Sequence, residues 1–126
     1  YVTDNISYDT SKASSVTSGY IPDISSILNS GKGICFDYAS VFAAMCRAQG
    51  IPTKLAIGYV KQSNSMVYHS WNYVYIKEKG WITVSFYLNK TGYNLDDATF
   101  YSTISDKSDA ADFINKNSHY QVYQYY

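Results

Sequence analysis

The amino-acid sequence predicts an α+β domain in which one long helix packs on an antiparallel sheet. Three observations support this prediction. Apolar residues recur at helical spacing over residues 35–48. Three runs of strand-forming composition follow, over 53–61, 69–77 and 81–88. A short turn containing Gly80 separates the last two runs and is typical of a β-hairpin. A helix followed by adjacent strands indicates the α+β class.

The segment ahead of the long helix, residues 1–30, is expected to be an arm packed on the core. It opens as irregular polar sequence without a regular apolar period. Pro22 is placed to sit early in a short helix that continues through Leu28, because proline is tolerated in the first turn.

The helix over 35–48 is the most clearly marked element. Gly50 followed by Pro52 is a typical helix stop. Cys46 lies well inside the helix and is expected to pack in the core, whereas Asp37 is a first-turn charge favoured by the helix dipole and needs no catalytic role. The apolar face consists of Ala39, Phe42, Ala43, Met45 and Cys46.

The sheet is predicted from alternation along the three runs. In the middle run, His69, Trp71, Tyr73 and Tyr75 share one face, and Ser70, Asn72, Val74 and Ile76 share the other. After residue 88 the sequence mixes turn residues with an expected helix near 110–114 and a final tyrosine-rich strand. We interpret the chain as one domain with an arm (1–30), a motif region (31–88) and a C-terminal extension of the core (89–126).

Composition excludes several classes of function. The chain has 126 residues, 46% of them hydrophobic, enough for one core. Ten basic residues balance ten acidic ones, so no nucleic-acid partner is indicated. No apolar run approaches the roughly 18 residues that span a bilayer. The spacing of cysteines, histidines and acids matches neither zinc sites nor EF-hands, and we expect no metal or other cofactor.

The fifteen tyrosines, with abundant Ser, Asn and Thr, favour an extracellular or cell-surface setting. Because the sequence opens without methionine, we interpret it as part of a larger or processed protein. The only two cysteines, Cys35 and Cys46, would be separated by roughly 16 Å along one helix, too far for a disulfide. We therefore expect two free thiols.

Cys35 stands where a loop becomes a helix, which is a position suited to a reactive thiol. The unpaired N–H groups of a first helical turn favour a thiolate, and Gly31 and Gly33 permit a close backbone approach. The alternative is that Cys35 is a small buried hydrophobe. A nucleophilic cysteine usually needs a base. His69 starts a predicted strand beside Trp71, and His119 lies in polar sequence where we expect it to be solvated.

The motif region resembles the transglutaminase-like superfamily of cysteine acyl-transfer enzymes. The resemblance is carried in order by residues 31–60 (GKGICFDYASVFAAMCRAQGIPTKLAIGYV), 69–76 (HSWNYVYI) and 80–85 (GWITVS). It implies a papain-like core in which Cys35 attacks an amide carbonyl and His69 carries the proton. The family also includes members that have lost catalysis.

One position departs from the family pattern. An aspartate usually stands four residues after the tryptophan of the third strand, and here that position is Ser85. Serine can orient the imidazole through its hydroxyl but cannot stabilise the imidazolium by charge. If the resting site is a thiolate–imidazolium pair, a neutral group suffices, as the asparagine of papain-like proteases does. We interpret the site as Cys-His-Ser; Asn72, Asp96 or Asp97 are alternative partners.

Strand parity tests the His69–Ser85 pair without reference to the family. In an antiparallel hairpin the numbers of opposed residues have a constant sum, so Ser85 shares the face of His69 only if that sum is even. This requires a connection of odd length or a bulge. A turn of even length would bring Asn72 to the face of Ser85 instead.

An oxyanion formed during attack needs preorganised donors. The backbone N–H of Cys35 is one candidate. The resemblance implies an aromatic donor upstream, which points first to Tyr8 and second to Tyr20, although both could be packing residues. Trp71 could border an apolar substrate cleft or belong to the core.

The sequence therefore predicts an acyl-transfer enzyme that forms a thioester with a protein or peptide, with a glutamine side chain as the foremost donor. An amine acceptor would make it a cross-linking transglutaminase, and water would make it a protease or amidase. The alternative from another class is an inactive surface adhesion or binding module, since tyrosine is favoured in protein interfaces.

Overall fold

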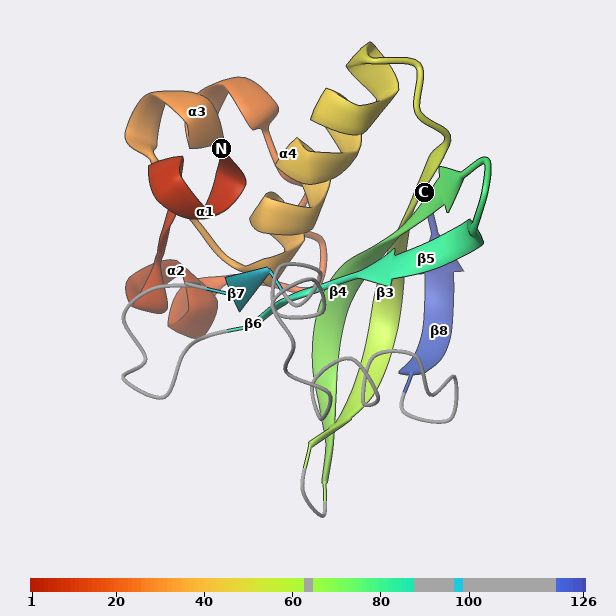
Figure 1. The fold of residues 1–126 in the computed structure, drawn as a ribbon. Coiled ribbons are helices and arrows are strands. Elements are labelled where there is room, and N and C mark those ends of the chain that lie inside the picture. Colours follow the sequence, from red (N-terminus) through yellow and green to blue (C-terminus); the bar gives the residue numbers. More distant parts are fainter. Residues whose placement is uncertain (63–64, 88–96, 99–119) are drawn as a thin grey trace.

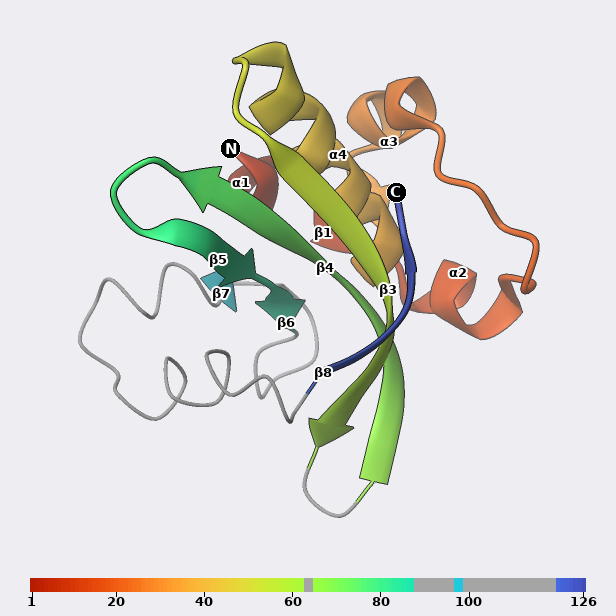
Figure 2. The same ribbon diagram turned by 90° about the vertical axis from the view of Figure 1, so that its right-hand side faces the viewer.

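The computed structural model describes residues 1–62, 65–87, 97–98 and 120–126. Within them, helices lie on one side of a four-stranded antiparallel sheet with strand order β5-β4-β3-β8, which confirms the α+β prediction (Figure 1, Figure 2). The helices are α1 (Val2–Asn5), α2 (Thr10–Ser15), α3 (Ile24–Ser30) and α4 (Cys35–Ala48). The strands are β1 (Ser7–Tyr8), β2 (Lys32–Gly33), β3 (Thr53–Gln62), β4 (Ser65–Ile76), β5 (Gly80–Val84), β6 (Phe86–Tyr87), β7 (Asp97–Ala98) and β8 (Tyr120–Tyr125).

Helix α4 begins and ends at the predicted residues. At its start the backbone N–H of Ile34 donates to Asp37 Oδ2 at 2.8 Å, so the carboxylate satisfies one of the donors left free at a helix N-terminus. At its end Gly50 adopts a left-handed conformation with φ of 74°, which only glycine adopts without strain. These local interactions explain why the boundaries could be predicted from the sequence.

Helix α4 covers one face of the sheet, and a separate apolar cluster covers the other. Asn72 Nδ2 donates to the Ala39 carbonyl at 3.0 Å, which ties β4 to the helix. On the helix side, two clusters contain Val2, Ile6, Ile27, Tyr38, Val41, Val74, Val84 and Phe86, and Ala39, Ala43, Leu55 and Ile57. On the far side lie Ala56, Val60 and Trp71, with Tyr73 and Val122 packed against them.

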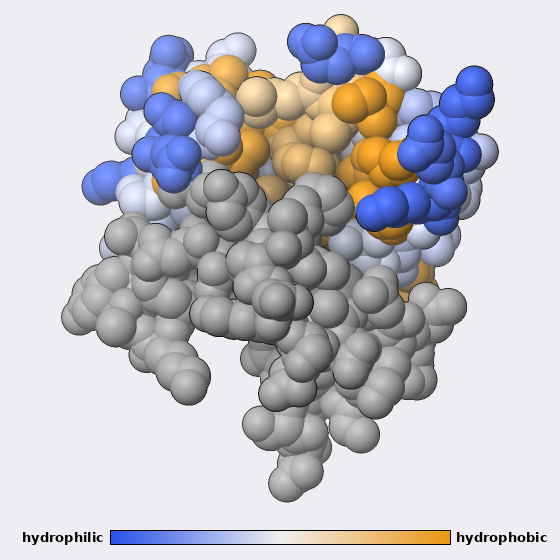
Figure 3. All heavy atoms as spheres, in the orientation of Figure 1, coloured by the Kyte–Doolittle hydropathy of each residue, from blue (hydrophilic) through white to orange (hydrophobic). Residues whose placement is uncertain are grey.

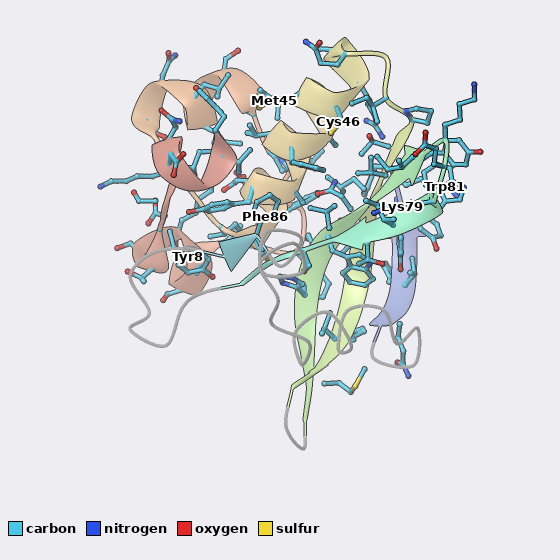
Figure 4. The ribbon with its side chains drawn as sticks, viewed as in Figure 1. Tyr8, Met45, Cys46, Lys79, Trp81 and Phe86 are labelled. Atoms are coloured by element: carbon cyan, nitrogen blue, oxygen red, sulfur yellow. The ribbon has the colours of Figure 1, made fainter. Side chains whose placement is uncertain are left out.

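The C-terminal half of α4 is more exposed than predicted. Met45 is 40% exposed and Cys46 is only partly buried, so the assignment of both to the core was wrong. Both lie at the end of the helix away from Phe86 (Figure 4), and an apolar band runs over α4 between hydrophilic side chains (Figure 3). The reason is geometric: the buried stripe of α4 ends at Ala43.

The N-terminal arm packs on the core as predicted, through Val2 and Ile6, which are almost fully buried. Although its sequence shows no regular apolar period, α1, β1 and α2 form there. Pro22 does not enter α3; the helix starts after Asp23, whose side chain accepts from the backbone of Ser25 and Ser26. Local capping by an aspartate therefore determines this start.

The sheet follows the predicted order with longer or divided strands. β4 begins four residues earlier than expected, and the third predicted run divides at Ser85 into β5 and β6. The final tyrosine-rich strand is confirmed as β8, which pairs with β3. The helix expected near 110–114 lies outside the described residues. Among the helices described, none has the length and apolar character needed to cross a membrane.

Gly58 allows β8 to approach β3 closely, at a β-bulge next to this residue. A Cβ atom at position 58 would lie 2.0 Å from the carbonyl oxygen of Gln121 and 3.0 Å from a ring carbon of Trp71. We expect Gly58→Ala to lower the free energy of unfolding by about 2 kcal/mol or more, because overpacking forces β8 away. Urea unfolding measures the loss. Gly19→Ala is the matched control, since a Cβ there meets nothing within 4 Å; equal stability of the two variants would contradict this account.

Candidate active site

Cys35 is the first residue of α4, and its sulfur lies against an open edge of β4. Strand β5 ends at Val84, which pairs with Asn72. Backbone N–H groups alternate sides along a strand, and the N–H of Tyr75 points toward β3. The N–H of Ser70 therefore points to the other side of β4, where β5 pairs, but at a position beyond the end of β5. From there the Ser70 N–H lowers the pKa of Cys35, so the thiol lies beside this part of β4.

The close passage before Cys35 depends on glycine. A Cβ atom at Gly33 would lie 2.6 Å from Cβ of Asp37, so any larger residue would displace this carboxylate. Gly31 ends α3 in the left-handed region with φ of 63°. The two glycines predicted to permit this approach therefore act for different reasons, one conformational and one steric.

Burial dominates the electrostatics of the thiol. It raises the pKa of Cys35 above its ordinary value, and the N–H groups of Ser70 and Phe36 offset only part of that effect. The N–H of Phe36 in the first turn acts in the predicted direction, because it favours the thiolate, but burial outweighs this contribution. In the resting state Cys35 is a neutral thiol at neutral pH.

Cys35 opens into a pocket of about 690 Å³. Six tyrosines line it, and none of the described side chains on its wall is an acid or a base. One wall comes from the segment between α2 and α3, and the other comes from β3, β4 and β8. The lining side chains include Tyr8, Tyr20, Tyr59, Tyr68, Tyr123 and Tyr126.

His69 and Ser85 form the predicted pair. His69 Nε2 lies 2.8 Å from Ser85 Oγ, and both residues are buried. The hairpin turn of three residues between Ile76 and Gly80 has the odd length that the parity argument requires. Ser85 follows Val84 onto the face of β4 that carries His69 and Trp71, whose rings stack with centroids 6.3 Å apart.

The imidazole is neutral in the resting protein. Burial lowers the pKa of His69 from 6.5 to about 4, and the neutral hydroxyl of Ser85 brings no charge that would raise it. A carboxylate at this position would act in the opposite direction. His69 therefore carries no charge at neutral pH in the resting protein.

This pKa makes the protein sensitive to acid. The unfolded chain takes up a proton on His69 below about pH 6.5, but the folded protein does so only near pH 4. The free energy of unfolding should therefore fall as pH decreases from 6.5 to 4, by up to about 3 kcal/mol from this group. Urea unfolding at a series of pH values measures the slope.

Two variants isolate the contribution of His69 from that of the carboxylates. In His69→Gln the fall in the free energy of unfolding between pH 6.5 and about 4 should lose the part that His69 contributes. In Ser85→Asp the new carboxylate should raise the pKa of His69 and displace the loss to higher pH, or reverse it. An identical pH profile in wild type and His69→Gln would show that His69 is not the group that titrates.

The alternative partners of His69 are placed elsewhere or not described. Asn72 is buried on the opposite face of β4 and donates to the Ala39 carbonyl, so it does not orient His69. Asp97 lies in β7, paired with Tyr87, and its side chain lies outside the described atoms. Asp96 and His119 also lie outside the described residues.

The two candidate oxyanion donors differ, because Tyr8 lies near Cys35 and Tyr20 bonds to Asp37. Tyr8 pairs with Gly33 through β1 and β2 and lines the Cys35 pocket. Burial and the nearby Cys35 raise the pKa of Tyr8, so its hydroxyl remains a donor at neutral pH. The Tyr20 hydroxyl donates to Asp37 and is occupied. Trp71 lies in the far-side apolar cluster beneath His69 and does not line this pocket.

Sequence reasoning missed two features of the site. Ser70 points to the opposite face of β4 from His69 and lowers the pKa of Cys35, and no local pattern indicates this. Asp37 is fully buried and forms an ion pair with Lys12 at 2.8 Å, besides accepting from Tyr20. A first-turn acid in a buried helix was visible, but its partners are distant in sequence.

Among the described residues, no three His, Cys, Asp or Glu side chains gather as metal ligands.

Comparisons with known proteins identify similar folds. A search of curated proteins found no significant match. Among solved structures, the chain is similar to a candidate cysteine protease from Cytophaga hutchinsonii (26% identity, TM-score 0.52, 67% of this chain and 27% of that one). It is also similar in fold to a protein named a TGase (22% identity, TM-score 0.54, 68% of this chain and 23% of that one). The chain thus covers only about a quarter of each of these proteins.

A family model described as the transglutaminase-like superfamily matches residues 1–86. This range contains α4 with Cys35, the β4 strand with His69, and Ser85. The match covers more than half of the chain, which therefore belongs to the transglutaminase-like superfamily.

Proposed function

We propose that this protein catalyses acyl transfer through a thioester on Cys35, with a glutamine side chain as acyl donor. The observation that carries the proposal is the buried hydrogen bond between His69 and Ser85. Ser70, the residue that follows His69 in β4, lowers the pKa of Cys35, which supports a thiol beside the same strand. A histidine held by one ring nitrogen presents the other for proton transfer.

The first half-reaction releases ammonia. The Ser85 hydroxyl accepts from Nε2–H of His69, which leaves Nδ1 as the proton acceptor. The Cys35 sulfur bonds to the amide carbon as its proton passes to Nδ1, directly or through one water molecule. The tetrahedral oxyanion is stabilised by the backbone N–H of Cys35 and the hydroxyl of Tyr8. His69 then gives the proton to the departing amine, and the C–N bond breaks.

The second half-reaction regenerates the thiol. An amine or a water molecule gives a proton to His69 while it attacks the thioester carbonyl. The C–S bond then breaks, and the thiolate recovers its proton from the imidazolium. With a lysine side chain as acceptor the product is a cross-link, and with water it is a deamidated glutamine or a cleaved peptide. We propose the amine as the acceptor.

The pocket supports an uncharged donor segment. Its described wall is built from tyrosines and small neutral side chains, with Cys35 at its base. A charged residue beside the reacting glutamine would lose hydration there without gaining an opposite charge. Glutamine is itself a neutral side chain, which is compatible with this wall, and tyrosine hydroxyls can bond its backbone.

The test combines trapping of the thioester with analysis of products. The protein is incubated with a glutamine-containing peptide, quenched in acid and fragmented, and the acyl group is located on Cys35 or Cys46 by mass spectrometry. Acylation of Cys35 supports the proposal. Acylation of Cys46 alone, or peptide binding without acylation of either thiol, overturns it and favours a binding module. With a fluorescent primary amine present, labelled peptide indicates transfer, and deamidation or cleavage alone indicates hydrolysis.

A further inference from the structure

Ser70 is a buried serine whose hydroxyl has no conventional partner. It is 1% exposed and follows His69 in β4, but its side chain points to the α4 side of the sheet. Among the described residues its Oγ makes no hydrogen bond of ordinary geometry. On that side the group it acts on is Cys35, whose pKa is lowered by both the Ser70 backbone N–H and the Ser70 hydroxyl.

A buried unpaired hydroxyl is unfavourable in the folded protein. A neutral thiol relieves this little, because its sulfur is a weak acceptor. A thiolate at the same place would be a strong acceptor, and hydrogen bonds to charged groups are roughly twice as strong as neutral ones. The gain from the Ser70 hydroxyl therefore appears only when the sulfur becomes an anion, which is the differential effect that accelerates a reaction.

We propose that Ser70 is a further catalytic residue, whose N–H and hydroxyl both donate to the Cys35 sulfur as it becomes a thiolate. The inference rests on the proposed function, because it concerns the nucleophile of that reaction. It accounts for how a site without a resting ion pair forms its nucleophile. His69 removes the proton, and Ser70 stabilises the charge that remains on sulfur.

Other titratable groups face the sulfur and must be kept constant. Asp37 on α4 disfavours the thiolate by its charge, whereas Tyr8 on β1 and Tyr68 on β4 are neutral well above pH 7 because burial raises the pKa of both. None of them changes when Ser70 is substituted. Cys46 on α4 is replaced by serine throughout, so that one thiol is observed.

The test compares Ser70→Ala with Ser70→Thr in the Cys46→Ser background. The pKa of Cys35 is measured from ultraviolet thiolate absorbance, and the rate of alkylation by iodoacetamide is measured at neutral pH. In Ser70→Ala the pKa should rise by about one unit and alkylation should slow about tenfold. Ser70→Thr keeps the hydroxyl and should restore much of both values.

A structural role alone would give a different result. Loss of packing would lower the thermal midpoint of Ser70→Ala and leave the pKa of Cys35 unchanged, and that outcome overturns the proposal. If Ser70→Ala is poorly folded, Ser70→Thr decides. A pKa of Cys35 and an alkylation rate that both equal those of the protein with Ser70 support the proposal. If the wild-type protein forms no thioester, the proposed function is refuted. The pKa comparison would still decide whether Ser70 stabilises the thiolate.

Discussion

Replacement of His69 with glutamine is expected to lower Cys35-dependent acyl transfer by about four orders of magnitude. Glutamine can still donate an amide N–H to Ser85 and keeps much of the volume. It cannot accept the thiol proton. Because burial raises the pKa of Cys35, the thiolate is scarce at neutral pH without a base, and the loss should be large. Initial rates of amine incorporation measure it.

Three further variants define what such a loss means. Cys35→Ala should reach the same low rate as His69→Gln, and the double variant should be no slower, because the two residues act as one unit. His119→Gln removes the only other histidine and should retain activity. A His69→Gln enzyme with more than about a tenth of the wild-type rate would exclude His69 as the base.

Serine in place of the usual aspartate is consistent with the burial of this site. A carboxylate beside His69 would favour the imidazolium, and this buried pair of charges would lose hydration on folding. Ser85 holds the ring at 2.8 Å without adding a charge, and the pKa of His69 falls to about 4. Cys35 and His69 are therefore both neutral at rest, and in the proposed reaction charge would develop only during acyl transfer. This explains how the departure from the family pattern can be compatible with activity.

The elements that the sequence predicted best are those stabilised by local interactions. The helix from Cys35 to Ala48 could be bounded because its stop depends on Gly50 and its apolar spacing is regular. The His69–Ser85 pair was predicted from the resemblance to the family, and the three-residue turn explains why both residues share a face. The helix boundaries depend on neighbours within a few positions, and the pair depends on the length of one short turn.

The features that were missed depend on contacts between distant segments. The arm is ordered by pairing of β1 with β2 and by the bonds of Asp37 to Lys12 and Tyr20, none of which is a local pattern. The role of Ser70 depends on where β5 ends beside β4. The protonation state of Cys35 depends on how completely the folded chain surrounds it, which no spacing of residues reveals.

The second large effect is expected at Asp37, where Asp37→Asn should lower the free energy of unfolding by about 3 kcal/mol. The buried carboxylate accepts from the Ile34 N–H, from the Tyr20 hydroxyl and from Lys12 Nζ, which also lies 4.4 Å from the centre of the Tyr20 ring. Asparagine keeps the shape but leaves the lysine charge without its counter-ion. Urea unfolding should show a lower midpoint at unchanged slope.

Comparison with a surface cap shows why burial matters for this effect. Asp23 also satisfies backbone N–H groups at a helix start, as the N-cap residue of α3, but it is exposed, so Asp23→Asn should have a much smaller effect. Lys12→Met should be costly in wild type and nearly neutral in the Asp37→Asn background, because the two charges stabilise each other. Additive losses would mean that no such coupling exists. Since this pair joins α2 to the start of α4 and Tyr20 lines the pocket, its loss should also weaken donor binding, measured as a raised KM.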